Sequence, residues 1–162
     1  IFGAVEVFAV DIHADKLTLA ETYGAIPIDA ASTDPVSEIR RLSQGRGVDV
    51  ALELIGLPQT MQQTTQCLAH MGRAVIAGIS SRPVQSEAYR DLIGREAEVI
   101  GSNDHLLGEL ETLVELVRRG RLDLARVVTD TVALEADAVN KTLDNLESFG
   151  GGGIRTVIVP GQ

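Results

Sequence analysis

Asp11 is the residue whose position suggests the most specific chemistry. It directly follows a short, apolar, β-branched segment at 5–10 that has the features of a buried strand. At the end of the second strand of a dinucleotide fold, a carboxylate can accept hydrogen bonds from both ribose hydroxyls and repel a 2′-phosphate. Lys16 could reach the same ribose from the first turn of the next helix. Asp11 could equally cap that helix or be solvated, and its position alone leaves both interpretations open.

Three further residues could contact a ligand. Gly78 and Gly101 follow apolar strands, where a glycine lets a flat ring approach the backbone. A plain turn would also explain each glycine. Arg155 opens the last strand after a run of four glycines, and its guanidinium fits the oxygens of a phosphate. Taken alone, Arg155 is better explained by a surface ion pair.

The remaining polar candidates give weaker signals. Glu53 lies in a segment that should be a buried strand, and it could face either a site or a neighbouring helix. Cys67, the only cysteine, is expected to be a small core residue on a helix. The three histidines lack metal-ligand spacing, and no nucleophile neighbours them. The sequence contains no Ser-His-Asp order, paired-carboxylate motif or P-loop.

Composition limits the classes of protein that need to be considered. The 162 residues are about the length of one domain, and 44% apolar with 23% charged residues is ordinary for a globular protein. A net charge of −9 argues against nucleic acid and anionic membranes as partners. The apolar runs are far shorter than the roughly 20 residues that a membrane helix needs. With one cysteine and no targeting segment, a cytoplasmic location is expected.

Strand and helix patterns alternate along the chain. Strands are predicted at 5–10, 26–29, 48–54, 73–79, 98–101, 127–134 and 154–159, and helices at 14–23, from 33–35 to 45–47, and at 59–70, 105–119 and 136–149. The segment 82–95 is predicted as a loop with a short helix or strand. This order predicts an α/β fold with a doubly wound parallel sheet. Ligands in such sheets bind at the carboxyl ends of the strands, which here are Asp11, 54–56, 78–80 and 101–103.

Taken together, these segments resemble the coenzyme-binding domain of the medium-chain, zinc-dependent alcohol dehydrogenase family. The resemblance rests on four ordered stretches: VFAVDIHADKL at 7–17, RGVDVALELIGLPQTM at 46–61, GRAVIAGI at 72–79 and GGIRTVIVP at 152–160. It implies a Rossmann-type fold that binds NAD and spans residues 1–162 as a partial domain. The implied coenzyme contacts are Asp11 and Lys16 at the adenosine ribose, Leu54 and Ile55 beside the coenzyme, Ala77, Gly78 and Ile79 along the nicotinamide, Ile100, Gly101 and Ser102 at the carboxamide through their backbone, and Arg155 at the pyrophosphate.

One expected motif is missing. A complete domain of this kind begins with a strand, a G-x-G-x-x-G loop and a helix. Gly45 and Gly47 have Val50 where the third glycine should be, and the glycines at 150–153 precede a strand. The first strand and its phosphate loop are therefore expected before Ile1, which leaves a gap in the sheet. The zinc-binding catalytic domain is expected outside this chain, which alone should be catalytically inactive.

The implied activity of the intact protein is hydride transfer between nicotinamide and an alcohol or carbonyl substrate, with zinc only in the catalytic domain. In this family the segment 89–93 falls where edge strands pair across a two-fold axis, so a homodimer or higher oligomer is implied. Two alternatives stay open. One is a non-catalytic, degenerate Rossmann module acting through self-association or a partner, and the other is a zinc-free, quinone-reductase-like member. A methyltransferase also places an acid after its second strand, but it does not explain the GGGIRTVI ending.

Overall fold

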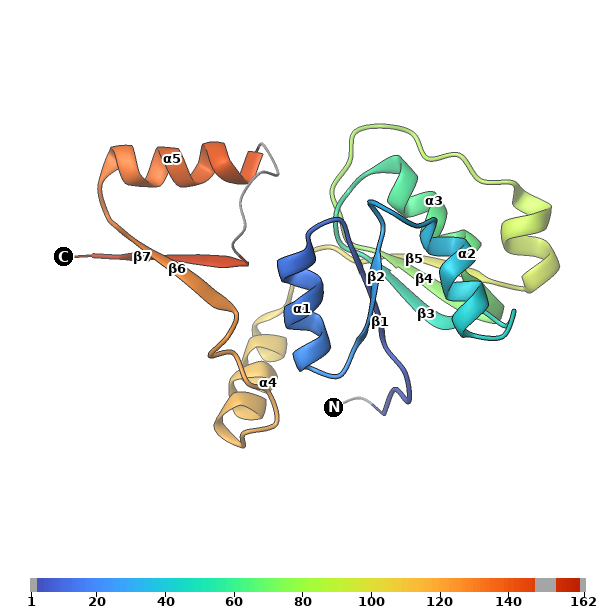
Figure 1. The fold of residues 1–162 in the computed structure, drawn as a ribbon, viewed down its shortest axis with the longest axis horizontal. Coiled ribbons are helices and arrows are strands. Elements are labelled where there is room, and N and C mark those ends of the chain that lie inside the picture. Colours follow the sequence, from blue (N-terminus) through green and yellow to red (C-terminus); the bar gives the residue numbers. More distant parts are fainter. Residues whose placement is uncertain (1–2, 148–153, 161–162) are drawn as a thin grey trace. The chain divides into compact units, whose positions relative to one another are not determined.

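The computed structural model describes residues 3–147 and 154–160. Helices and strands alternate through most of the chain (Figure 1), which divides into two compact units. One unit is Ile28–Leu106, and the other consists of Ile1–Pro27 and Leu107–Gln162. The strands β1 (Phe8–Asp11) and β2 (Ile26–Asp29) form a two-stranded sheet and are joined by α1 (Ala14–Thr22).

The unit Ile28–Leu106 is built on a three-stranded parallel sheet of β3 (Val48–Glu53), β4 (Leu68–Ile76) and β5 (Glu98–Gly101), in that order. Helix α2 (Pro35–Leu42) begins where Asp34 Oδ2 accepts the backbone N–H of Ser37 at 2.8 Å. Helix α3 (Pro58–Gln66) packs against α2, β3 and β4. Buried apolar residues line this packing: Ile39, Met61, Cys67, Leu68, Ala69 and Ala74.

The carboxyl end of α3 is held by two arginines. Arg40 Nη2 donates to the carbonyls of Gln66 (3.0 Å) and Leu68 (2.8 Å), while its Nη1 donates to those of Gly45 and Arg46. Arg95 Nη1 donates to Gln66 (2.7 Å) and Leu68 (3.0 Å) as well. Helix ends leave carbonyls without intrahelical partners, and these two guanidinium groups satisfy them.

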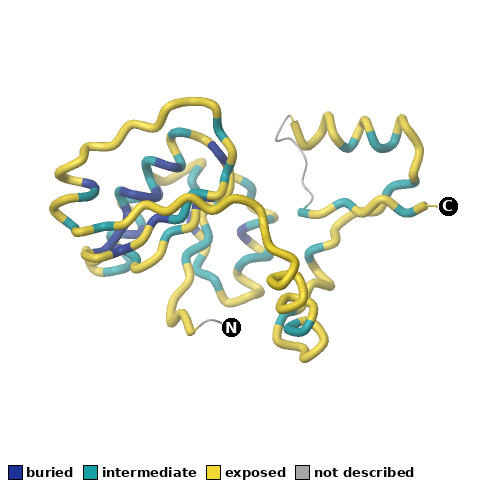
Figure 2. The backbone as a smooth tube through the Cα atoms, turned by 180° about the vertical axis from the view of Figure 1, so that it is seen from behind, coloured by how far each residue is buried: buried dark blue, intermediate teal, exposed yellow. Residues whose placement is uncertain are grey.

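The second unit is more open. It holds α4 (Leu107–Arg118), α5 (Ala136–Glu147) and a parallel pair of strands, β6 (Val128–Ala133) and β7 (Arg155–Val159). Neither α4 nor α5 has a buried residue, and Figure 2 shows these segments in the colours of exposed and intermediate residues. The apolar stripe predicted for α4 exists, but its side chains stay exposed: Leu107, Leu110, Leu113, Val114 and Val117.

The predicted α/β class with parallel strands is confirmed, and the strands form three separate sheets within the described residues. No ladder in this part of the chain connects the β1–β2 pair to β3. The predicted helix 59–70 is wrong beyond Gln66, because β4 already begins at Leu68 and runs through Gly72. Val48 N–H donates to the Cys67 carbonyl, Met71 has φ +58°, and a Cβ on Gly72 would lie 3.0 Å from the Val48 carbonyl. An early irregular strand here depends on contacts with β3 that periodicity does not encode.

The segment 89–93 does not form the edge strand on which pairing between subunits was predicted. Residues Ala88–Leu92 form a π-helical turn, followed by a 3₁₀ turn at Ile93–Arg95. The buried carboxylate of Asp91 accepts hydrogen bonds from the Glu87 N–H (3.0 Å), the Ser86 hydroxyl and Arg90 Nε (2.8 Å). These local bonds stabilise a helical turn in place of an extended strand. The four glycines at 150–153, and the predicted helix beyond Glu147, lie outside the described residues.

Candidate functional site

The carboxyl ends of β3, β4 and β5 meet at one edge of the three-stranded sheet. The Glu53 carbonyl accepts the N–H groups of Ala77 (2.9 Å) and Gly78 (3.1 Å), and the Ile76 carbonyl accepts the N–H of Ser102 (2.9 Å). The parallel register continues this order, with Glu53 beside Ile76 and Ile76 beside Gly101. The structure therefore brings together the predicted residues at or directly after the ends of these strands: Leu54, Ile55, Ala77, Gly78, Ile79, Ile100, Gly101 and Ser102.

Two of the turns at this edge cross backbone to backbone. A Cβ built on Gly78 would overlap the Gly56 nitrogen and lie 2.5 Å from Glu53 Oε2. Gly56 has φ +87°, and a Cβ there would overlap the Ile79 carbonyl oxygen. Glycine is thus required at position 78 because two turns cross there with no room for a side chain. The sequence alone suggests only a ring contact or a plain turn for Gly78. Glycine is required at position 56 for the same reason.

The crossing leaves an apolar surface open around the strand ends. Leu54 is 72% exposed and Ile79 is 91% exposed, while Ile55 and Ile100 are also exposed. Gly101 has no atom within 4 Å of where its Cβ would be, so the backbone there is accessible. Exposed branched side chains beside an open backbone suit a flat ring that needs apolar contact on its face and hydrogen bonds at its edge.

Glu53 lies beneath this surface and is only 2% exposed. Its Oε1 accepts the Ile55 N–H (3.1 Å), the Gly56 N–H (2.9 Å) and the hydroxyl of Thr60 in α3 (2.6 Å). Its Oε2 is buried with no hydrogen-bond partner among the described residues. From the sequence, Glu53 could face either a site or a neighbouring helix, and the structure shows that it bonds to the turn after β3 and to Thr60 of α3.

Asp11 ends β1 and organises the turn that follows. Its Oδ1 accepts the N–H groups of Ile12 (2.8 Å) and His13 (2.9 Å). The N-cap of α1 is His13, without a side-chain cap, so the alternative interpretation of Asp11 as the helix cap is wrong. No hydrogen bond to Oδ2 is found in the described part of the chain. Lys16 is half-buried in the first turn of α1, with no ion pair to Asp11.

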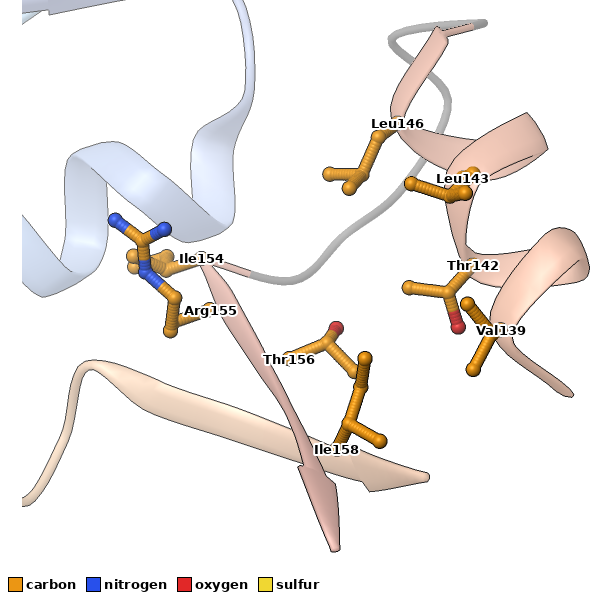
Figure 3. A pocket seen from close by; sticks show the side chains of 8 residues that line it. All are labelled: Val139, Thr142, Leu143, Leu146, Ile154, Arg155, Thr156 and Ile158. Carbon is orange, nitrogen blue, oxygen red and sulfur yellow. The ribbon is translucent and has the colours of Figure 1, made fainter. Parts of the chain in front are cut away.

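Arg155 begins β7 and points away from α5 (Figure 3). Its guanidinium makes no ion pair with any described residue, so the surface ion pair considered from the sequence is not seen there. Thr156 and Ile158 of β7 face residues of α5 across a cavity of about 160 Å³, which Ile154 also lines. That cavity is mainly apolar, and the arginine contributes to its rim.

The composition of the described residues limits the class of site that they could form. They contain no group of three or more histidine, cysteine, aspartate or glutamate side chains that could hold a metal ion. No helix among them is long and apolar enough to cross a membrane. The strand ends of the three-stranded sheet present backbone amides and apolar side chains. In the other unit, Asp11 Oδ2 and the Arg155 guanidinium have no hydrogen bond or ion pair with a described residue.

Alternating elements, parallel ladders and an open edge at the strand ends define a Rossmann-like α/β fold. The family model for the zinc-binding dehydrogenases matches residues 1–119. The chain therefore belongs to the zinc-binding dehydrogenase family.

Individual relatives agree with this assignment. An NAD-dependent alcohol dehydrogenase of Sulfurisphaera tokodaii is 33% identical over 95% of this chain and 43% of its own length. An L-threonine 3-dehydrogenase of Bacillus velezensis is 31% identical over 82% of this chain and 39% of its own. The crystal structure of an alcohol dehydrogenase from Aeropyrum pernix superposes with a TM-score of 0.80 at 32% identity, covering 95% of this chain and 42% of that one. The chain spans less than half of the length of each of these relatives.

Proposed function

We propose that the intact protein is an NAD-dependent dehydrogenase and that this chain supplies its coenzyme-binding part, as a partial domain over 1–162. The observation that carries the proposal is the meeting of the ends of β3, β4 and β5 at one open, backbone-lined edge within the matched region. The naming of a 33% identical relative as an NAD-dependent alcohol dehydrogenase supports the choice of coenzyme. The substrates proposed are small alcohols or carbonyl compounds, as the relatives' names suggest.

When bound, NAD would supply the carbon that accepts or donates the hydride. Ala77, Gly78 and Ile79 would cover one face of its nicotinamide, and the exposed Ile79 would exclude water there. The backbone at 100–102 would bind the carboxamide, because the Gly101 position leaves room for close approach. Leu54 and Ile55 would flank the coenzyme. The proposed role of this chain is therefore to hold and orient the coenzyme, and we place zinc in a part of the protein outside it.

Asp11 is proposed as the ribose-binding residue. Its Oδ1 is committed to the turn, which fixes the carboxylate, and Oδ2 remains for a ribose hydroxyl. The fixed negative charge would also disfavour a 2′-phosphate. Lys16 would support the ribose contact from α1, and Arg155 would bind the pyrophosphate through its guanidinium, which makes no ion pair with a described residue.

Coenzyme titrations of the intact protein test this proposal. Calorimetry should show that NAD⁺ binds more tightly than NADP⁺, and D11S should move the ratio toward NADP⁺ by about tenfold, equivalent to roughly 1.4 kcal/mol. D15S, which removes an acid four residues further on, is the matched control and should leave the ratio unchanged. Equal affinities for the two coenzymes in the unmodified protein, or an unchanged ratio in D11S, would refute the role of Asp11. Absence of binding to either coenzyme would refute the proposed function.

The location and assembly of the protein are also proposed. A single, buried cysteine is compatible with a reducing, cytoplasmic environment. We propose a homodimer or higher oligomer, supported by the exposed Tyr89 (76%) and Ile93 (64%) on the segment where the family resemblance implies pairing. Because this segment is helical, the pairing would use side chains and not a shared strand ladder. Light scattering of the intact protein would measure its mass.

A further inference from the structure

Two carboxylates in the unit Ile28–Leu106 are almost completely buried, and their surroundings differ. Asp91 is 0% exposed, and both of its oxygens are bonded: Oδ1 to Arg90 Nε, and Oδ2 to the Glu87 N–H and the Ser86 hydroxyl. Glu53 is 2% exposed, makes no ion pair with a described residue, and leaves Oε2 without a hydrogen bond there. A buried oxygen without a partner is costly, so its presence in a folded protein calls for an explanation.

The explanation lies in what the two oxygens of Glu53 touch. Oε1 collects three donors from the turn after β3 and from the start of α3, which fixes that turn. Oε2 lies against the turn after β4, where it occupies space that a side chain at position 78 would need. The carboxylate is therefore wedged between the two crossing turns, bonded to one and in contact with the other.

The backbone of Glu53 strengthens this arrangement. Its carbonyl oxygen accepts the N–H groups of both Ala77 and Gly78, so one residue bonds to both turns. A displaced carboxylate would release the N–H groups of Ile55 and Gly56 and allow the crossing at Gly78 to shift. The exposed side chains on either side of the crossing, Leu54 and Ile79, would then lose their fixed separation.

We propose that Glu53 is a positioning residue for the coenzyme, whose carboxylate holds the turn 54–56 against the turn 77–79. The inference rests on the proposed function, since those turns carry the predicted coenzyme contacts. Glu53 itself does not touch the coenzyme, because it is buried beneath the surface that the turns form. Its effect is on the geometry of the surface and hence on coenzyme affinity.

Three substitutions of Glu53 separate the effect of its side-chain length from the effect of its negative charge. E53Q keeps the length and an oxygen for the three donors, E53D keeps the charge but is one methylene too short, and E53M keeps neither oxygen. We expect NADH affinity to fall about tenfold in E53D and E53M and no more than about threefold in E53Q, since tenfold corresponds to one or two lost hydrogen bonds. E53D binding NADH as well as or better than E53Q would overturn the proposal.

D91N is the matched control, because it alters a carboxylate that is also buried in the same unit but has no hydrogen bond to the turns 54–56 and 77–79. Each variant is titrated with NADH by calorimetry, and its melting temperature is measured in the absence of ligand. We expect D91N to lower the melting temperature while NADH affinity stays within about twofold of the unmodified protein. An equal loss of affinity in D91N and E53D would show a general effect of destabilisation and overturn the proposal.

The same titrations distinguish this inference from the proposed function. If the unmodified intact protein binds NADH and E53D and E53M bind it equally well, only the role of Glu53 is overturned. If the unmodified protein does not bind NADH, the proposed function fails and the inference fails with it. Should E53M not fold, the comparison of E53Q with E53D still decides between the outcomes.

Discussion

The two units of this chain differ sharply in how much of their apolar surface is buried. In Ile28–Leu106, side chains from α2, α3 and β4 form a core that includes Ile39, Met61 and the fully buried Leu68. In the other unit, Leu17 is the one described apolar side chain that reaches the same degree of burial. Buried apolar area is the main source of stability, so we expect the unit Ile28–Leu106 to be the more stable part.

This contrast matters for the proposed site because the predicted residues are divided between the units. The strand ends that would contact the nicotinamide belong to the well-packed unit, and their turns are fixed by Glu53. Asp11, Lys16 and Arg155 belong to the more open unit. We therefore expect the turns at the ends of β3, β4 and β5 to be ordered before the coenzyme arrives, and Asp11, Lys16 and Arg155 to lie on segments that are less ordered in the free protein.

The largest effect should come from truncating the core. We expect L68A to reduce the free energy of unfolding by about 3 kcal/mol, because Leu68 is 0% exposed and its removal leaves a cavity. The same change in α4, L113A, removes a side chain that is 44% exposed and should cost less than about 1 kcal/mol. Urea denaturation measures both. Equal costs would contradict the difference between the units.

The next effect concerns Arg40 of α2, whose guanidinium bonds to carbonyls at the end of α3. R40M removes the donors to four carbonyls and should lower the free energy of unfolding by about 2 kcal/mol. This is less than four full hydrogen bonds would contribute, because water can replace the arginine at the exposed carbonyls. R41M, one residue on, removes an exposed pair with Glu38 and should leave stability nearly unchanged. Thermal melts of the two variants compare them directly, and a larger loss in R41M would contradict this role of Arg40.

The stability of the unit Ile28–Leu106 should depend on pH through Asp91. Burial raises the pKa of Asp91, but the hydrogen bonds from Arg90, Glu87 and Ser86 and the charge of Arg90 outweigh it, so the pKa lies below its ordinary value of 3.8. A lowered folded-state pKa contributes stability that is present above the ordinary value and is lost as pH falls through the folded-state value. We expect D91N to be less stable than the unmodified protein at neutral pH and to lose less on acidification. D15N, which changes an exposed acid of α1 without an ion pair to a described residue, is the control and should leave stability nearly unchanged at every pH. A difference between D91N and the unmodified protein that is constant from pH 7 to strongly acidic pH would refute this.

The last prediction concerns the rate at which the Cys67 thiol reacts. The thiol is buried, and burial raises its pKa to about 11. Because the thiolate is the reactive form, a disulfide reagent at pH 8 should modify Cys67 only as fast as the unit opens. The rate in folded protein should rise in L68A, which destabilises that unit, and stay unchanged in L113A. Rapid labelling of the unmodified protein would contradict the proposed packing around Cys67.

Much of the fold could be predicted from the sequence because its signals are local. The apolar strand at 48–54 and the capped helix that starts at Asp34 follow from periodicity and capping, and both are found nearly where predicted. The end of α3 was misplaced because its signal is not local. The carbonyls of Gln66 and Leu68 are satisfied by arginines 26 to 29 residues away, and β4 begins through a contact with Val48. The turn at 88–95 likewise depends on the buried carboxylate of Asp91.

For the site, position after a strand was sufficient to predict which residues meet at the edge of the sheet. It could not predict how tightly they meet. The crossing of Gly56 with Gly78 and the wedged carboxylate of Glu53 involve three separate segments, and a single sequence carries no signal for their distance.

Hydrogen exchange of the intact protein with and without saturating NADH tests the central claim most directly. We predict that NADH slows exchange in peptides covering 54–57, 77–79 and 100–103, because the coenzyme would cover the backbone at these strand ends. Peptides covering 107–118 in α4 should exchange at the same rate in both conditions. Unchanged exchange at the strand ends under conditions where NADH is bound would contradict the placement of the coenzyme at this edge of the sheet.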